Sequence, residues 1–173
     1  MRVPKKNNRK FWKRYFRWKE DYCFAARDLL DVSLDNRQEE ILHSIQHNRR
    51  TSVRSGTARG KDFVGAVGSV LFLYLEAWHD VNEDFVEYTP VKVVNTAPTG
   101  RQIKNIMIPE ISKLYSKGNL DFMLGELMSD GIRWHIPVYK EWYLVGFKAS
   151  NENVEAWSGI HAPNVMVVVT EAS

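Results

Sequence analysis

The pattern of apolar and polar residues along the chain predicts several helices. Apolar and aromatic residues recur at spacings of three and four over residues 11–30, which is typical of an amphipathic helix. Asp35 or Asn36 is expected to cap a second helix that runs to about His47, because these side chains accept hydrogen bonds from the first amides of a helix. The apolar stretch 63–78 predicts a buried helix, since it is shorter than the roughly 20 residues of a membrane span.

Short β-branched or alternating segments predict strands between these helices. They lie at residues 51–54, 91–95, 133–138, 142–147 and 165–169. The third and fourth are expected to form a hairpin around a turn at 139–141, and a helix with one apolar face is expected over about 101–115. The last strand is an uninterrupted apolar run, which is typical of a central parallel strand buried on both faces. The alternation predicts a three-layer α/β fold with a mainly parallel sheet.

The N-terminal segment differs in charge from the rest of the chain. The net charge is +3, yet residues 1–19 hold nine Lys or Arg residues and no acid, while the remainder holds 15 basic and 21 acidic residues. We therefore expect a basic arm and helix at 1–33, with a disordered tail at 1–10, attached to one domain at 34–173. Two interpretations of the helix at 11–30 remain open. Either its aromatic residues pack on the domain and leave a solvated basic face, or aromatic and basic groups together grip nucleic acid or a motor partner.

Cysteine usage and the N-terminus indicate the compartment. The single cysteine, Cys23, cannot form an intramolecular disulfide, and the N-terminus lacks the ordered regions of a signal peptide. We expect a cytoplasmic protein without membrane association.

A glycine-containing loop between a predicted strand and a predicted helix is the strongest candidate for chemistry. Its residues are Ser55, Gly56, Thr57, Ala58, Arg59, Gly60, Lys61 and Asp62. Glycines let backbone N–H groups turn towards a phosphate chain, a lysine meets the outer phosphates, and a helix N-terminus completes the anion site. Gly56 lies one residue closer to Gly60 than the usual spacing, and Asp62 stands where Ser or Thr is usual. The alternative is an ordinary glycine loop that caps a helix.

The predicted strand at 165–169 is followed directly by Thr170 and Glu171. In P-loop ATPases a strand next to the phosphate loop ends in a magnesium-linked Asp, and in one subgroup a following Glu polarises the attacking water. Glu171 occupies the position of that glutamate, and the alternative is a solvated acid at a strand end. The separation from Lys61 leaves room for the strand at 91–95 and its helix.

Two further segments agree with this interpretation. Gln38 lies before the loop at a place where several such ATPases read the adenine edge, since an amide both donates and accepts hydrogen bonds. Its alternative role is a polar first turn of a helix. Residues 95–99 resemble the motif that couples nucleotide state to nucleic acid in helicase-like motors, and the alternative is a capped strand-to-helix turn.

The order of these motifs resembles the ATPase part of phage terminase large subunits over residues 34–173. The segments that carry the resemblance are LDNRQEEIL, NRRTSVRSGTARGKDF, VVNTAPTGRQ and WSGIHAPNVMVVVTEAS. The resemblance implies a P-loop NTPase that binds ATP and Mg²⁺ and drives double-stranded DNA into a prohead, with the portal protein and the small terminase subunit as partners. It also implies that Gln38 touches adenine, that Gly60 and Lys61 hold phosphates, that Arg59 acts on the γ-phosphate and that Glu171 activates water.

Departures from the family pattern add two expectations. Family members have Ser or Thr after the loop lysine and Asp before the glutamate, whereas this chain has Asp62 and Thr170. We therefore hypothesise that the carboxylate and the hydroxyl that bind magnesium have exchanged places. Asp62 then supplies the carboxylate from the loop, and Thr170 supplies the hydroxyl from the strand end. The family also continues with a coupling motif and a nuclease, so the ATPase domain is expected to be C-terminally incomplete and to self-associate through its uncovered sheet.

Two other functions remain alternatives. One is a helicase-like ATPase that acts on other nucleic acid. The other is a non-catalytic remnant, from a phage or prophage gene, that binds nucleotide or DNA without turnover.

Overall fold

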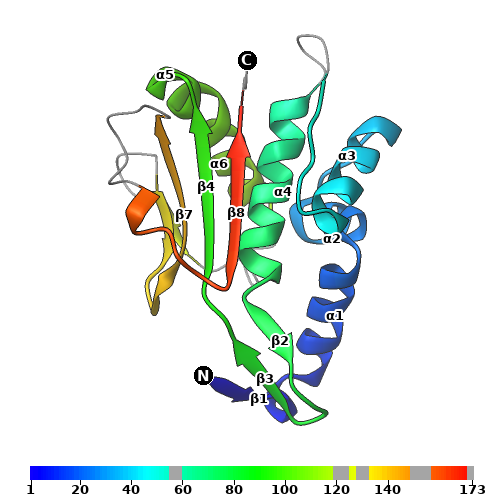
Figure 1. Cartoon of the computed structure of the whole chain (residues 1–173). Coiled ribbons are helices and arrows are strands. Elements are labelled where there is room, and N and C mark those ends of the chain that lie inside the picture. The colour runs from blue at the N-terminus through cyan, green and yellow to red at the C-terminus, as the bar shows by residue number, and fades with distance from the viewer. Residues whose placement is uncertain (55–59, 119–124, 128–132, 149–156, 171–173) are drawn as a thin grey trace.

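Figure 1 shows the computed structural model of the chain, which describes residues 1–54, 60–118, 125–127, 133–148 and 157–170. The helices are α1 (Arg9–Glu20), α2 (Tyr22–Leu30), α3 (Asn36–His47), α4 (Lys61–Leu75), α5 (Gly100–Gln102) and α6 (Ile108–Lys117), with a 3₁₀ turn η1 (Lys5–Asn7) and a π-helical turn η2 (Ile103–Met107). The strands are β1 (Arg2–Pro4), β2 (Trp78–Asp80), β3 (Phe85–Tyr88), β4 (Val91–Ala97), β5 (Glu126–Leu127), β6 (Arg133–Ile136), β7 (Tyr139–Lys148) and β8 (Asn164–Val169).

The larger sheet has the order β5-β6-β7-β4-β8. Strand β4 pairs in parallel with both β7 and β8, while β5, β6 and β7 are antiparallel neighbours. A small antiparallel sheet of order β1-β3-β2 lies beyond the start of β4 (Figure 1). The predicted α/β class is confirmed at the level of a mixed sheet with a parallel centre.

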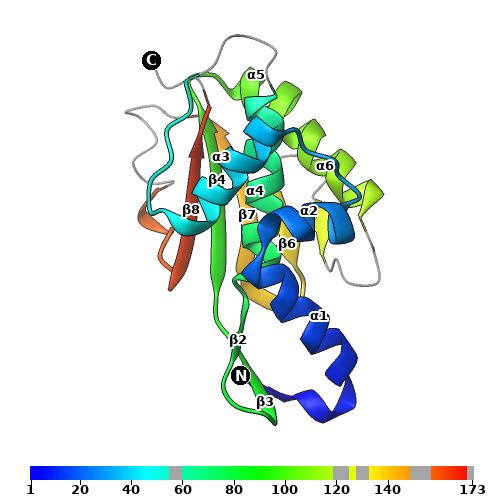
Figure 2. The ribbon, with the colours of Figure 1, turned by 90° about the vertical axis from the view of Figure 1, so that its right-hand side faces the viewer.

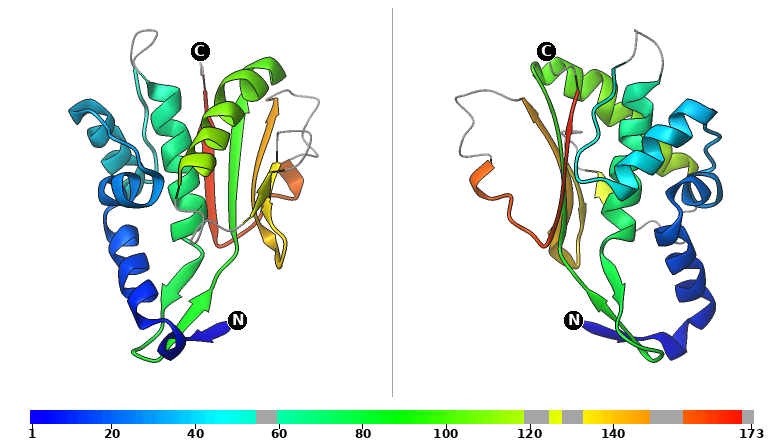
Figure 3. Two further views of the ribbon diagram at one scale, coloured as in Figure 1. Left: turned by 180° about the vertical axis from the view of Figure 1, so that it is seen from behind. Right: turned by 45° about the vertical axis from the view of Figure 1, so that its right-hand side comes forward.

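The helices lie on one face of the larger sheet. Figures 2 and 3 show α4 and α6 against the sheet, with α1, α2 and α3 outside α4. On the opposite face, Val165, Val167 and Val169 of β8 are 38%, 46% and 52% exposed. The expectation that this strand is central and buried on both faces is therefore wrong for the described residues, because β8 ends the sheet and no described helix covers its outer face.

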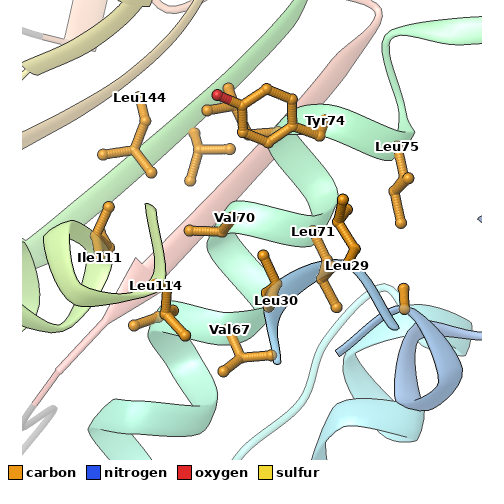
Figure 4. Packing of buried hydrophobic residues seen from close by; sticks show 14 of the residues in the cluster. Leu29, Leu30, Val67, Val70, Leu71, Tyr74, Leu75, Ile111, Leu114 and Leu144 are labelled. Atoms are coloured by element: carbon orange, nitrogen blue, oxygen red, sulfur yellow. The ribbon is translucent and has the colours of Figure 1, made fainter. Parts of the chain in front are cut away.

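Helix α4 forms the centre of the core, as its nearly all-apolar sequence predicts. Its side chains meet α2, α6 and the sheet, and Figure 4 shows Val67, Val70 and Leu71 inside this cluster. Two buried hydrogen bonds join its last turn to distant elements: Trp142 Nε1 donates to Leu73 O at 2.6 Å, and Tyr15 Oη donates to Tyr74 O at 2.6 Å.

The N-terminal segment is more ordered than expected. The predicted disordered tail is wrong, because β1 pairs with β3 and the amide of Lys5 donates to Asp84 O at 2.7 Å. The single helix predicted over 11–30 is interrupted at Asp21, whose extended backbone (φ −142°, ψ 99°) ends α1 and whose side chain caps α2. A short acceptor side chain at this position favours a new N-terminus over continuation of the helix.

Other boundaries also differ from the predictions. Residues 51–54 lie outside the sheet, because β propensity forms no strand without a neighbour to pair with, and none of the described strands pairs with them. The turn of the β6–β7 hairpin falls at residues 137–138, before the predicted 139–141. The helix expected over 101–115 with one apolar face leaves Ile106 39% exposed, because the π-helical turn changes the angular spacing of residues there.

Gly146→Ala is expected to destabilise the fold by about 1–3 kcal/mol. A Cβ built on Gly146 in β7 lies 2.4 Å from Cγ2 of the buried Ile103, so the π-helical turn must move away from the sheet. Gly100→Ala is the matched control, because no atom lies within 4 Å of its added Cβ. Urea denaturation of both variants measures the effect, and equal midpoints would contradict this close packing.

Candidate functional site

Helix α4 begins at the edge of the sheet where the parallel strands end (Figure 1). Close packing holds the helix there: a Cβ built on Gly65 lies 3.5 Å from Val168 Cγ1 of β8, and Ser69 Oγ lies 3.2 Å from Asn95 Oδ1 of β4. Ligands of open α/β sheets bind in this position, outside the carboxyl ends of the strands. The edge therefore forms the candidate site.

Gly60 gives the helix an N-terminus without a side-chain cap. Its backbone is left-handed (φ 72°, ψ 17°), and no side chain accepts a hydrogen bond at the cap. The first helical backbone bond runs from Val64 N to Gly60 O at 3.0 Å, so the amides before Val64 have no partner within the helix. These amides and the helix dipole favour an anion at this point.

Gln38 lies against this N-terminus, although 22 positions separate it from Gly60 in the chain. A Cβ on Gly60 would lie 2.6 Å from Gln38 Nε2, so a side chain at position 60 would displace this amide. The other end of the side chain belongs to a capping box of α3: Gln38 Oε1 accepts from Asp35 N at 3.1 Å, and Gln38 N donates to Asp35 Oδ1 at 2.9 Å. The polar first turn considered as the alternative is thus present, and it directs the amide nitrogen towards the loop.

Lys61 and Asp62 form the first turn of α4 and are half-buried. Within the described part of the chain, no hydrogen bond or ion pair is recorded for either side chain. An ammonium without a described partner, beside amides that have none within the helix, suits a phosphate. The carboxylate repels a phosphate unless a cation lies between them.

Asn95 and Thr96 are buried at the end of β4. Asn95 Oδ1 accepts from Ser69, but Asn95 Nδ2 and Thr96 Oγ1 have no partner among the described residues. Thr99 then caps α5 in a capping box with Gln102, as expected for a capped strand-to-helix turn. Because Asn95 is buried, its side chain cannot contact a macromolecule directly. Its recorded interaction is the hydrogen bond with Ser69 of α4.

Thr170 continues β8 alongside β4. Its amide donates to Thr96 O at 3.0 Å, and its hydroxyl lies 3.4 Å from the same oxygen. The described residues contain no cluster of three or more His, Cys, Asp or Glu side chains suited to a metal. Magnesium in nucleotide sites needs only one or two protein oxygens besides phosphate and water, so the oxygen donors Asp62 and Thr170 remain compatible with it.

Several predicted site residues lie outside the described residues. They are Ser55, Gly56, Thr57, Ala58 and Arg59 of the loop, and Glu171 after β8. Of the remaining predicted residues, Gln38 lies against Gly60, and Lys61 and Asp62 follow Gly60 in the first turn of α4. Thr170 follows the last residue of β8.

Ser69 is a residue of this edge that the sequence reasoning missed. It is fully buried, and its hydroxyl, which has one proton to donate, lies 2.8 Å from Gly65 O and 3.2 Å from Asn95 Oδ1 of β4. The signal was the group of small residues Gly65, Gly68 and Ser69 on one helix, a spacing that allows close approach of the sheet and of α3.

Comparisons with known proteins identify no family for this chain. No protein-family model matches the chain, and no curated protein matches it significantly. None of the helices in the described ranges is long and apolar enough to cross a membrane.

Proposed function

We propose that this chain binds ATP with Mg²⁺ at the N-terminus of α4 and belongs to a P-loop ATPase that translocates double-stranded DNA, of the terminase large subunit type. The observation that carries the proposal is the meeting of Gln38, Gly60 and Lys61 at the carboxyl edge of a parallel sheet. A glycine in left-handed conformation, a lysine and a helix N-terminus are the parts that hold phosphates in such ATPases.

Each residue has a role in this proposal. The α4 amides and Lys61 bind the outer phosphates, and Gln38 Nε2 lies where it can donate to the loop or to the nucleotide. Asp62 and Thr170 would hold Mg²⁺, which supplies positive charge to the phosphates when it is bound. Arg59 would approach the γ-phosphate, and Glu171 would take the proton of the attacking water.

The finer fold is part of the same proposal. A P-loop NTPase sheet has helices on both faces, whereas the described helices cover one. The exposed β8 face and edge fit a sheet that is completed by further protein, either in the same chain or in another copy. DNA, a portal protein and a small terminase subunit are the partners that the proposal names.

ATP binding is expected to depend strongly on divalent metal. A carboxylate beside the loop lysine repels the phosphates, and a bound cation reverses that effect. We expect the affinity for ATP to fall on the order of tenfold or more when Mg²⁺ is removed from the wild-type protein, as measured by calorimetric titration.

A double substitution tests whether the two magnesium ligands have exchanged places. Asp62→Thr removes the loop carboxylate, and Asp62→Thr with Thr170→Asp restores one carboxylate on the strand side. In Mg²⁺ the double variant is expected to bind ATP more tightly than Asp62→Thr alone. Additive effects of the two substitutions, or metal-independent binding by the wild type, would disprove the exchange.

A further inference from the structure

Helix α1 has two faces with different roles. Trp12, Tyr15 and Trp18 are at most 8% exposed, so its aromatic face is buried in the core. The opposite face carries Arg9, Lys10, Lys13 and Arg17, all exposed. At about 100° per residue these four cations fall within roughly 100° of arc, and they extend over about 12 Å of the helix. We call this set the α1 basic strip.

The charges of the strip are largely unused within the protein. The structure records no ion pair for Arg9, Lys10 or Lys13 with any described residue, and Arg17 lies over the Phe24 ring at 4.1 Å. Arg14, beside the strip, is different: it bonds both carboxylate oxygens of Asp28 at 2.9 Å and holds the pKa of that carboxyl below its ordinary value.

The strip also opposes the stability of its own helix. Arg9 and Lys10 lie in the first turn, where the helix dipole disfavours positive charge, and this turn contains no acid. Arg9 and Lys13, like Lys13 and Arg17, are like charges four residues apart, which repel each other. Folding therefore gives no reason for this arrangement, whereas binding of a polyanion does.

We propose that the α1 basic strip binds the phosphate backbone of double-stranded DNA. The strip is rigidly held, because Tyr15 Oη bonds Tyr74 O and Trp18 Nε1 bonds Asp28 Oδ2 at 2.6 Å each. Duplex DNA carries about one phosphate charge per 1.7 Å of its axis, so a strip of about 12 Å that lies along the duplex meets several phosphates. The buried aromatic rings cannot stack on bases, so the strip binds the phosphate charges and does not distinguish one base sequence from another.

The same burial disfavours two other partners. A helix that lies in a membrane interface needs an exposed apolar face, and the aromatic face of α1 is covered. A single-strand surface needs exposed rings for stacking, whereas the aromatic rings of this helix are buried or only partly exposed. The choice of DNA among polyanions rests on the proposed function, but the contact itself requires no nucleotide.

The test is salt-dependent binding of a short labelled DNA duplex, measured by fluorescence anisotropy without ATP. The variant is Arg9→Gln, Lys10→Gln and Lys13→Gln, and the control is Lys104→Gln, Lys113→Gln and Lys117→Gln, which removes the same charge from exposed positions of η2 and α6. The strip variant is expected to reduce the slope of log affinity against log salt by about 2.7, because three phosphate contacts are lost. The dissociation constant at low salt should rise on the order of tenfold or more.

The melting temperature separates binding from folding. The strip variant should melt at the same or a higher temperature than the wild type, since repulsion within α1 is relieved. An unchanged salt slope, an equal loss in the control, or binding to anionic phospholipid vesicles without binding to DNA would overturn the proposal. Because the assay contains no nucleotide, a failure of ATP binding at Lys61 leaves its outcome unaffected.

Discussion

Lys61→Ala is expected to lower the affinity for ATP at least on the order of a hundredfold, or about 2.8 kcal/mol. Lys61 starts α4 immediately after the left-handed Gly60, and the described residues contain no acid paired with it. Its ammonium is therefore available to the outer phosphates, and alanine removes this charge from the phosphate site. Calorimetric titration with ATP and Mg²⁺ measures the loss.

Two controls make this result specific. Lys104→Ala removes a lysine that is exposed on η2 and should leave the affinity unchanged. Lys61→Arg keeps the charge on a differently shaped group and should bind ATP more tightly than Lys61→Ala. If Lys61→Ala binds ATP as tightly as the wild type, the loop does not hold the phosphates.

Glu171→Gln is expected to stop ATP hydrolysis while ATP binding persists. A carboxylate that takes a proton from the attacking water contributes about 10²- to 10⁴-fold to the rate, and an amide cannot take that proton. The amide still accepts and donates hydrogen bonds, so the nucleotide remains bound. Phosphate release and ATP titration, measured on the same preparation, separate the two effects.

The role of Glu171 as the catalytic base depends on this comparison. Equal loss of binding and hydrolysis would make Glu171 a structural residue, and a normal rate would exclude it as the base.

Local sequence signals predicted much of the fold. The cap at Asp35, the all-apolar α4 and the β-branched runs of β4 and β8 each fix a local conformation, and all four elements are present near the expected positions. Such elements are predictable because capping and apolar periodicity act over one or two turns.

Long-range pairing was not predictable in the same way. Residues 2–4 become a strand only because β3, more than 80 residues later, offers a partner. Residues 51–54 have strand-forming side chains but no described neighbour, so they form none. The residue pattern of a segment sets its tendency to form a strand, whereas a strand forms only where a neighbouring strand can pair with it.

The candidate site was predicted in part. The sequence identified Gly60, Lys61 and Gln38 separately, but their contact depends on how α3 packs beside α4. Ser69 escaped notice, and Asn95 was identified only as part of the motif at 95–99, because a buried hydrogen bond between a helix and a strand leaves no pattern in either segment. Their importance follows from burial, which makes each polar atom require a partner.

An ATP derivative with an acyl group on its terminal phosphate tests the central claim most directly. The amine of a lysine beside the outer phosphates attacks the acyl carbonyl, the bond to the phosphate oxygen breaks, and ATP leaves while an amide forms on the lysine. Peptide mass spectrometry then identifies the modified residue. The account predicts that Lys61 is labelled in the presence of Mg²⁺ and that excess ATP prevents the labelling. Labelling of other lysines with Lys61 unmodified, or labelling that ATP does not reduce, would contradict a phosphate site at the start of α4.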